Sequence, residues 1–161
     1  MQAVTILQAD LENPTHQQAV VDLINAYARE PMGLGRDLPE DVRRDLVPGL
    51  RRHPTTLIFL ALSGEDPVGV AVCFLGFSTF AARPLVNVHD LAVLPAYRDR
   101  GVGRRLLEQV AATARALGCC TITLEVKEDN TRAQRLYQKM GFEGITPNGG
   151  TGDMWFLQKR L

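Results

Sequence analysis

The chain has 161 residues, a formal net charge of +0 at pH 7 and a hydrophobic share of 45%. This length suits one domain with a sizeable core, so we expect a single domain over residues 1–161. The balanced charge argues against a nucleic-acid or polyanion surface, and no apolar stretch approaches membrane-spanning length. We therefore expect a protein that binds neither nucleic acid nor a membrane.

The cysteines and the N-terminal residues bear on the compartment. Cys73, Cys119 and Cys120 are odd in number and two are adjacent, which predicts neither a disulfide framework nor a metal site. Their spacing also supports no catalytic triad for an acyl-enzyme. The first residues lack the basic region and apolar run of a secretory signal. We expect a reducing cytoplasm and no bound metal.

The chain begins with a strand pattern and a helix pattern. Val4–Leu7 is rich in β-branched residues and predicts a first strand. Pro14 and Thr15 offer a helix start, and an apolar face that includes Tyr27 follows at helical spacing. Proline and glycines in residues 31–35 end this helix.

A second helix and a hairpin come next. Pro39 predicts the helix start, Val42 is expected to face inward, and Pro48 is expected to end or bend the helix. Residues 55–62 and 68–77 read as two strands joined by a short polar turn. Their spacing predicts an antiparallel hairpin.

The centre of the chain reads as strand, glycine-bearing turn and helix. An apolar run from Val86 to Val93 precedes Gly101 and Gly103, and an amphipathic pattern extends from Val102 to Leu117. This arrangement directs free backbone N–H groups and the positive end of the helix dipole at an anion. The glycines would let a ligand approach the backbone closely. The stretch predicts a phosphate-binding site.

A further strand and a shorter helix follow. Residues 121–126 predict the strand, Asp129 or Asn130 can cap the helix, and Gly141 suits the left-handed position after its end. The last strand candidates are Phe142 and Met154–Leu157, on either side of a glycine-rich loop over residues 144–152. Strands around two strand–helix units predict an α/β fold, a mixed sheet with helices on both faces.

Two motifs in the second half resemble those of one family. Arg98-x-x-Gly101-x-Gly103 resembles the acetyl-CoA signature of the GNAT superfamily of N-acetyltransferases. Downstream, Asn130-x-x-Ala133-x-x-x-Tyr137-x-x-x-Gly141-Phe142 resembles the second motif of that family, in its order and at its usual separation. The segments Phe77–Phe80, Pro84 and Val88–Leu91 resemble, more loosely, the spermidine/spermine acetyltransferase branch.

The resemblance implies the GNAT fold, whose central sheet is mixed and mostly antiparallel, and it implies acetyl-CoA as the co-substrate. Related enzymes often pair, and the apolar residues Met154–Leu157 read as an edge strand with surface left to bury, so we expect a homodimer. The cofactor contacts that the resemblance implies are at Leu91, Ala92, Val93, Arg98, Asp99, Arg100, Gly101, Val102, Gly103, Arg104, Asn130, Ala133 and Tyr137.

Acetyl transfer to an amine requires a neutral amine, donors for an oxyanion and an acid for the leaving thiolate. A lysine-like amine has a pKa of ~10.4, so a base or a water chain must remove its proton. A strand N–H can bind the oxyanion. Tyr137 is the candidate acid, because a phenol of pKa ~10 stays protonated at neutral pH. Helical spacing alone favours a core tyrosine, whereas the motif favours catalysis.

His89 and Asp90 are the candidate bases. Alternation along a strand predicts that they lie on opposite faces, so only one can face the substrate unless a bulge intervenes. Histidine has the more suitable ordinary pKa, ~6.5. Asp90 can instead hold an ammonium group or orient a water, and an ordered water can itself act as the base.

These observations lead to three hypotheses. The first is an N-acetyltransferase that moves acetyl from acetyl-CoA directly to a primary amine of a small molecule, such as a polyamine or an amino acid. The second is acetylation of a protein N-terminus or lysine, and the third is a non-catalytic acyl-CoA-binding regulatory module. We expect the acceptor pocket to include residues 32–37 and 78–83.

Overall fold

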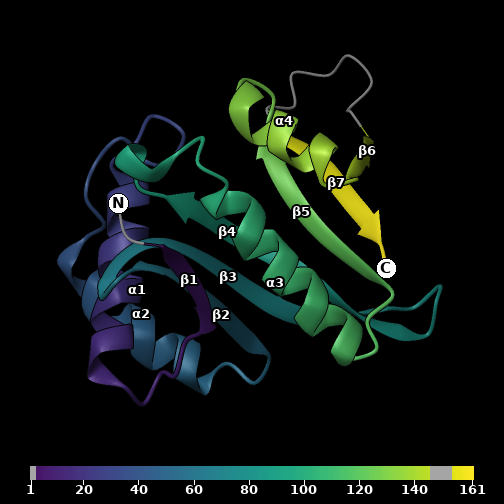
Figure 1. Ribbon diagram of the computed structural model, residues 1–161. Coiled ribbons are helices and arrows are strands. Elements are labelled where there is room, and N and C mark those ends of the chain that lie inside the picture. Colours follow the sequence, from purple (N-terminus) through teal and green to yellow (C-terminus); the bar gives the residue numbers. More distant parts are fainter. Residues whose placement is uncertain (1–2, 146–153) are drawn as a thin grey trace.

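The computed structural model describes residues 3–145 and 154–161 (Figure 1). Within these ranges a 7-stranded sheet has the order β1-β2-β3-β4-β5-β7-β6. The only parallel neighbours in this described sheet are β4 and β5. The elements in chain order are β1 (Val4–Gln8), α1 (Pro14–Ala28), α2 (Glu40–Arg52), β2 (Thr56–Ser63), β3 (Asp66–Ser78), β4 (Arg83–Val93), the 3-10 helix η1 (Pro95–Tyr97), α3 (Val102–Ala116), β5 (Thr121–Lys127), α4 (Thr131–Lys139), β6 (Glu143–Ile145) and β7 (Met154–Arg160).

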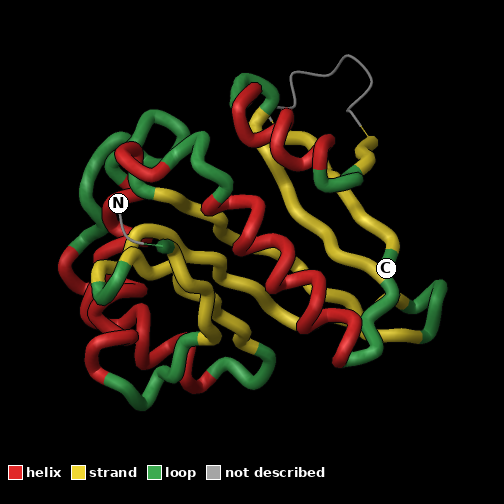
Figure 2. The backbone as a smooth tube through the Cα atoms, viewed as in Figure 1, coloured by secondary structure: helices red, strands yellow, loops and turns green. Residues whose placement is uncertain are grey.

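Helices cover both faces of the sheet, which confirms the predicted α/β class with a mostly antiparallel mixed sheet. Figure 2 shows α3 crossing one face, with α1 and α2 on the other. Leu106 and Leu107 of α3 are fully buried on the first face, and burial of each stabilises the fold by ~1.5–3 kcal/mol. Val20 and Leu23 of α1 pack on the second face. The sheet thus separates two cores.

Asparagine side chains fix the starts of two helices. Asn13 caps α1 by accepting a hydrogen bond from the Thr15 N–H at 2.9 Å, so the cap lies one residue before the expected Pro14. Asn130 caps α4 in the same way, accepting from the Ala133 N–H at 3.2 Å. Gly141 follows α4 with a φ of 82°, as predicted for the left-handed position.

Helix α2 differs from the prediction in two respects. It continues past Pro48 to Arg52, so of the two outcomes expected at that proline, an end or a bend, the end is not observed. A proline inside a helix costs about 3 kcal/mol, and burial of Val47 and Leu50 on either side offsets that cost. Val42 was expected to face inward and is instead 41% exposed.

Strand β7 is not the edge strand that its apolar residues suggested. It lies between β5 and β6, because Glu143–Ile145 pairs with the side of β7 that β5 leaves free. Gly144 permits this pairing, since a Cβ there would lie 2.0 Å from Leu157 Cδ2. The greater part of the expected glycine-rich loop, residues 146–152, lies outside the described residues.

No helix in the described ranges is both long and apolar enough to cross a membrane.

Candidate functional site

The candidate site lies where β4 and β5 separate. The two strands pair only from Val86 to Val88 on β4 and from Ile122 to Leu124 on β5. β4 then continues to Val93 and β5 to Lys127 without pairing to each other. Figure 1 shows the two strands diverging toward the end at which α3 begins. The separation opens an edge in the middle of the sheet.

Backbone groups of β4 face this open edge. The Leu94 N–H donates to the Val68 carbonyl of β3 at 2.9 Å. Bonded and non-bonded pairs alternate in an antiparallel ladder, so Leu91 and Val93 direct their N–H and C=O groups away from β3. Ala92 directs its own toward β3. Of the predicted contacts 91–93, only the first and last therefore present backbone groups to the opening.

The start of α3 is an anion-binding geometry close to this edge. Its first helical hydrogen bond joins the Arg105 N–H to the Gly101 carbonyl at 3.0 Å, which leaves the N–H groups of Val102, Gly103 and Arg104 without helical partners. No side chain in the described ranges caps the helix, and its first turn holds no acidic residue. The free N–H groups and the helix dipole together favour a bound phosphate.

The two glycines of this turn have different tasks. Gly101 has a φ of +79°, which glycine adopts without strain, and nothing lies within 4 Å of a Cβ built there. At Gly103 a Cβ would lie 3.1 Å from Leu136 Cδ2 of α4. Gly101 therefore sets the loop conformation, whereas Gly103 lets α3 approach α4. Asp99 precedes them, also with a positive φ of 58°.

Arg98 is bound to protein groups. Its Nε donates to the Val93 carbonyl at 2.8 Å, and its guanidinium pairs with the Glu30 carboxylate just after α1. The two side chains are only 19% and 21% exposed. The sequence motif implied that Arg98 contacts the cofactor, and the structure adds that it ties the glycine-bearing loop before α3 to the segment just after α1.

Asn130 and Ala133, the other implied cofactor contacts, are engaged with each other. The Asn130 side chain accepts from the Ala133 N–H as the cap of α4. Ala133 is partly buried against the core on the α3 side of the sheet. Both residues therefore fix where α4 begins, and α4 carries Tyr137 two turns later.

A β-bulge places both candidate bases on one face. Val72 pairs with Asp90 and Cys73 with Val88, so His89 is an extra residue in β4. Asp90 shares the face of Val72, which belongs to the core beneath α1. The ring of His89 lies 5.6 Å from that of Phe74, which packs against the same core. The predicted opposite orientation of His89 and Asp90 is therefore not observed.

Asp90 lies in a partly buried environment shared with Tyr27 of α1. Burial raises the pKa of the Asp90 carboxyl, and the charge of His89 opposes that rise. Burial also raises the pKa of Tyr27, with further contributions from the negative charges of Asp90 and Glu30. Sequence reasoning did not identify Tyr27 as a neighbour of Asp90, because helical spacing marked it as one more residue of an apolar face.

Tyr137 approaches the opening between β4 and β5 from the opposite face of the sheet. Its side chain is 6% exposed, and its ring centroid lies 5.7 Å from that of Phe142. Burial raises its pKa above the ordinary value, and the charge of Tyr27 adds to the rise. No described residue hydrogen-bonds its hydroxyl, which is also not sealed from solvent. The hydroxyl is therefore accessible to a ligand.

The cysteines do not provide a nucleophile here. Burial, with the charge of Asp90, raises the pKa of Cys73 to about 12, so it remains a thiol at neutral pH. Cys119 is buried, and burial raises its pKa too. Among the described residues, no group of His, Cys, Asp and Glu side chains could hold a metal ion.

The two expected acceptor segments lie apart. Residues 32–37 begin two positions after Glu30, and the Gly33 N–H donates to the Glu30 carbonyl at 2.9 Å, so they stand next to the Arg98 ion pair. Residues 78–83 form the β3–β4 turn, where the Arg83 guanidinium donates to the Gly118 carbonyl at 3.0 Å. Gly118 follows α3, at the opposite end from Gly101. The 78–83 turn is therefore distant from the opening between β4 and β5.

The model of the acetyltransferase (GNAT) family matches residues 20–142 of the chain. This range includes α1 from Val20 onward, the bulge in β4, the start of α3 and the whole of α4.

Named relatives match part of the chain. Thialysine N-epsilon-acetyltransferase of Bos taurus is 32% identical over 87 residues, which are 54% of this chain and 51% of that protein. N-alpha-acetyltransferase RimI of Mycobacterium tuberculosis is 38% identical over 84 residues, 51% of each chain. The chain thus spans about half the length of these relatives. The crystal structure of the NatC complex bound to Gag peptide and CoA shares the fold, with a TM-score of 0.75 and 23% identity over 100% of this chain and 99% of that chain.

The geometry at Gly101 generates a prediction for acetyl-CoA, the ligand that the motif implies. Gly101→Val should raise the Kd at least about tenfold, or ~1.4 kcal/mol, because valine at this φ distorts the loop that presents the N–H groups. Gly118→Val is the matched control, since it introduces similar strain at a φ of +73° beyond the other end of α3. Calorimetry should find the Kd of the control unchanged. Equal Kd values in both folded variants would contradict the assignment.

Proposed function

The chain belongs to the acetyltransferase (GNAT) family, and we propose that it transfers an acetyl group from acetyl-CoA directly to a primary amine of a small molecule. The observation that carries this proposal is the opening between β4 and β5. The α3 N-terminus lies on one side of the sheet there, the Asp90 carboxylate on the other, and Tyr137 beside them.

On the cofactor side, the pyrophosphate of acetyl-CoA would bind the free N–H groups of Val102, Gly103 and Arg104. The pantetheine arm would run along the open edge of β4. There it meets the N–H groups of Leu91 and Val93, while the Val93 carbonyl already accepts from Arg98. A strand N–H at this edge would also donate a hydrogen bond to the oxyanion.

On the acceptor side, Asp90 would hold the incoming ammonium group and remove its proton. Its carboxylate is negatively charged when ionised, and burial makes it a stronger base than an exposed aspartate. His89 remains the second candidate, since the bulge places it on the same face, and an ordered water is the third. Partial burial favours Asp90 over the exposed His89.

Tyr137 would protonate the departing thiolate. Burial keeps its phenol protonated at neutral pH, and its hydroxyl has no protein partner in the described ranges that would compete for its proton. With Cys73 held as a thiol, direct transfer is favoured over an acyl-enzyme. The free cysteines also support a reducing cytoplasm as the compartment.

Acetylation of a protein N-terminus is the second candidate function. The name of the Mycobacterium tuberculosis relative favours it, and that of the Bos taurus relative favours a small amine. A non-catalytic acyl-CoA-binding module is a third, against which the accessible Tyr137 hydroxyl argues. Release of CoA from acetyl-CoA, measured with an amine panel, with peptides and without acceptor, separates these functions. Turnover that no acceptor stimulates would support the non-catalytic module.

Tyr137→Phe should lower kcat by ~10²–10⁴-fold if the phenol is the general acid. The Kd of acetyl-CoA should change little, because phenylalanine retains the ring contact with Phe142. Melting temperature is the control for the fold, since the lost hydroxyl has no hydrogen bond to another described residue. A variant with wild-type kcat on its best acceptor would leave Tyr137 as a packing residue.

The pH profile tests the base. We expect kcat/KM to rise with pH as amine and base lose protons, with no fall up to about pH 10, because burial raises the Tyr137 pKa above its ordinary ~10. Asp90→Asn should lower kcat by ~10²-fold or more, and His89→Ala should retain the rising limb.

Stability separates this loss from unfolding. A raised pKa means that Asp90 stabilises the fold at low pH, and this contribution is lost as pH rises through its folded pKa. Asp90→Asn should therefore melt at a higher temperature than wild type at neutral pH. A wild-type kcat in Asp90→Asn, or loss of the limb in His89→Ala, would assign the base elsewhere.

We also propose a homodimer. Met154 and Phe156 on β7 are 43% and 41% exposed, and no helix among the described elements covers their face of the sheet. Light scattering at micromolar concentration should report twice the mass of the 17.8 kDa chain. A monomer mass at that concentration would refute the dimer.

A further inference from the structure

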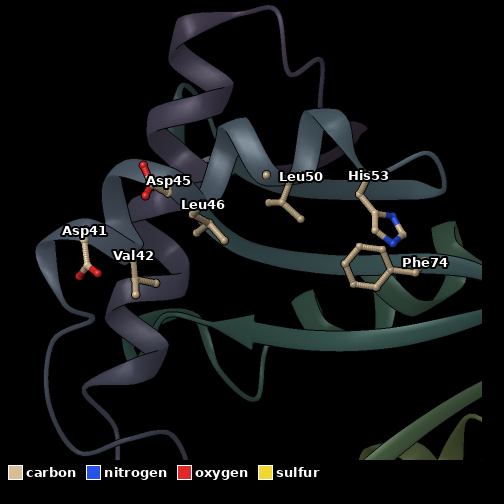
Figure 3. A pocket seen from close by; sticks show the side chains of 8 residues that line it. Asp41, Val42, Asp45, Leu46, Leu50, His53 and Phe74 are labelled. Carbon is tan, nitrogen blue, oxygen red and sulfur yellow. The ribbon is translucent and has the colours of Figure 1, made fainter.

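A groove lies between α2 and the sheet, on the face that carries Asp90 (Figure 3). Its volume is about 440 Å³. Figure 3 shows Leu46 and Leu50 of α2 directed toward the strands, with His53 above the ring of Phe74. Nothing in the proposed acetyl-CoA site uses this groove.

The groove is connected to the candidate base by edge-to-face ring contacts. The Phe74 ring lies 4.7 Å from that of His53, which lines the groove, and 5.6 Å from that of His89. His89 precedes Asp90, and the bulge places both on the face of Phe74. An amine at Asp90 would therefore have the rest of its molecule directed along Phe74 toward α2.

The lining of the groove is apolar with a negative rim. Asp41 and Asp45 are its charged lining residues, and neither lysine nor arginine lines it. Asp45 pairs with Arg44 at 2.8 Å, so part of its charge is offset. Asp41 forms no ion pair with any described residue. A hydrocarbon chain with a cationic end is complementary to this surface.

We infer that the groove is the specificity site for the acceptor, and that it selects small amines with an apolar chain behind the reacting amine and a second cation at its far end. This inference rests on the proposed acetyl transfer. The apolar chain of the acceptor packs on Phe74 and Leu46, and Asp41 attracts the cation at its far end. A peptide fits less well, because its backbone amides would lose their water partners against this apolar lining.

Gly49 offers a test that does not disturb the fold. It lines the groove, and nothing lies within 4 Å of a Cβ built there. Gly49→Leu should fill the groove while favouring the helical conformation. Gly49→Ala is the matched control, with the same backbone effect and little added volume.

The probes are ethylamine, hexylamine and hexamethylenediamine, assayed as acceptors with the 161-residue chain. Each buried methylene contributes about fourfold in affinity, so wild type should prefer the two longer amines by at least about tenfold in kcat/KM. Gly49→Leu should abolish this preference and leave ethylamine unchanged, while Gly49→Ala retains it. A preference that survives Gly49→Leu would overturn the inference while leaving the proposed function intact.

The rim charge has its own control. Asp41→Asn should lower kcat/KM for hexamethylenediamine about threefold or more without affecting hexylamine. Glu40→Gln removes the same charge from the preceding residue, which does not line the groove, and should affect neither. Equal effects of the two variants would overturn the role of Asp41. Failure of wild type to acetylate any amine would overturn the proposed function itself, and the inference with it.

Discussion

The rest of the site depends on the separation of two parallel strands. A parallel pair normally continues as long as both strands do, because every unpaired N–H and C=O group needs a partner. Here β4 and β5 pair over Val86–Val88 and then part, which leaves backbone groups of Leu91 and Val93 facing open space. Arg98 satisfies one of them, the Val93 carbonyl. The remaining groups are what an extended ligand with its own amides can bind. The opening also interrupts the sheet that separates the two cores, so side chains from opposite faces can contact one ligand.

The elements around the opening are linked by contacts that hold both sides in position. Glu30 at the end of α1 pairs with Arg98, which follows β4 and precedes the start of α3. Leu136 of α4 packs against Gly103 of α3, so the glycine-bearing turn and the helix that carries Tyr137 fix each other. Tyr27 is close enough to influence both Asp90 and Tyr137 electrostatically. The acceptor side and the cofactor side therefore share a framework, although the sheet divides them.

Sequence patterns predicted most of the fold because the helices and strands bury regular apolar faces. They predicted the turn at Gly101 because a left-handed backbone conformation, here a φ of +79°, favours glycine and so leaves a visible mark in the sequence. They did not predict the bulge at His89, since one extra residue in a strand changes no residue type and only shifts alternation. They allowed α2 to end at Pro48, but burial of the adjacent Val47 and Leu50 offsets the cost of that proline, and the helix continues to Arg52. They placed β7 at an edge because a short strand such as β6 has almost no pattern of its own. Tyr27 and the α2 groove depend on contacts between distant segments, which spacing along one element cannot reveal.

Burial raises the pKa of both candidate catalytic groups, but the chemical consequence differs between the acid and the base. Removing an ionisable group from water disfavours its charged form, so the pKa values of Asp90 and Tyr137 both rise. For an acid that must remain protonated until a thiolate departs, this rise preserves the required form. For a carboxylate that must take a proton from an ammonium group, the same rise makes the ionised form a stronger base. Since an oncoming ammonium group would itself stabilise the charged carboxylate, the cost of ionising Asp90 falls when the acceptor arrives. The environment thus suits an acid and a base at one opening, and it would couple the reactivity of Asp90 to the binding of a cationic acceptor.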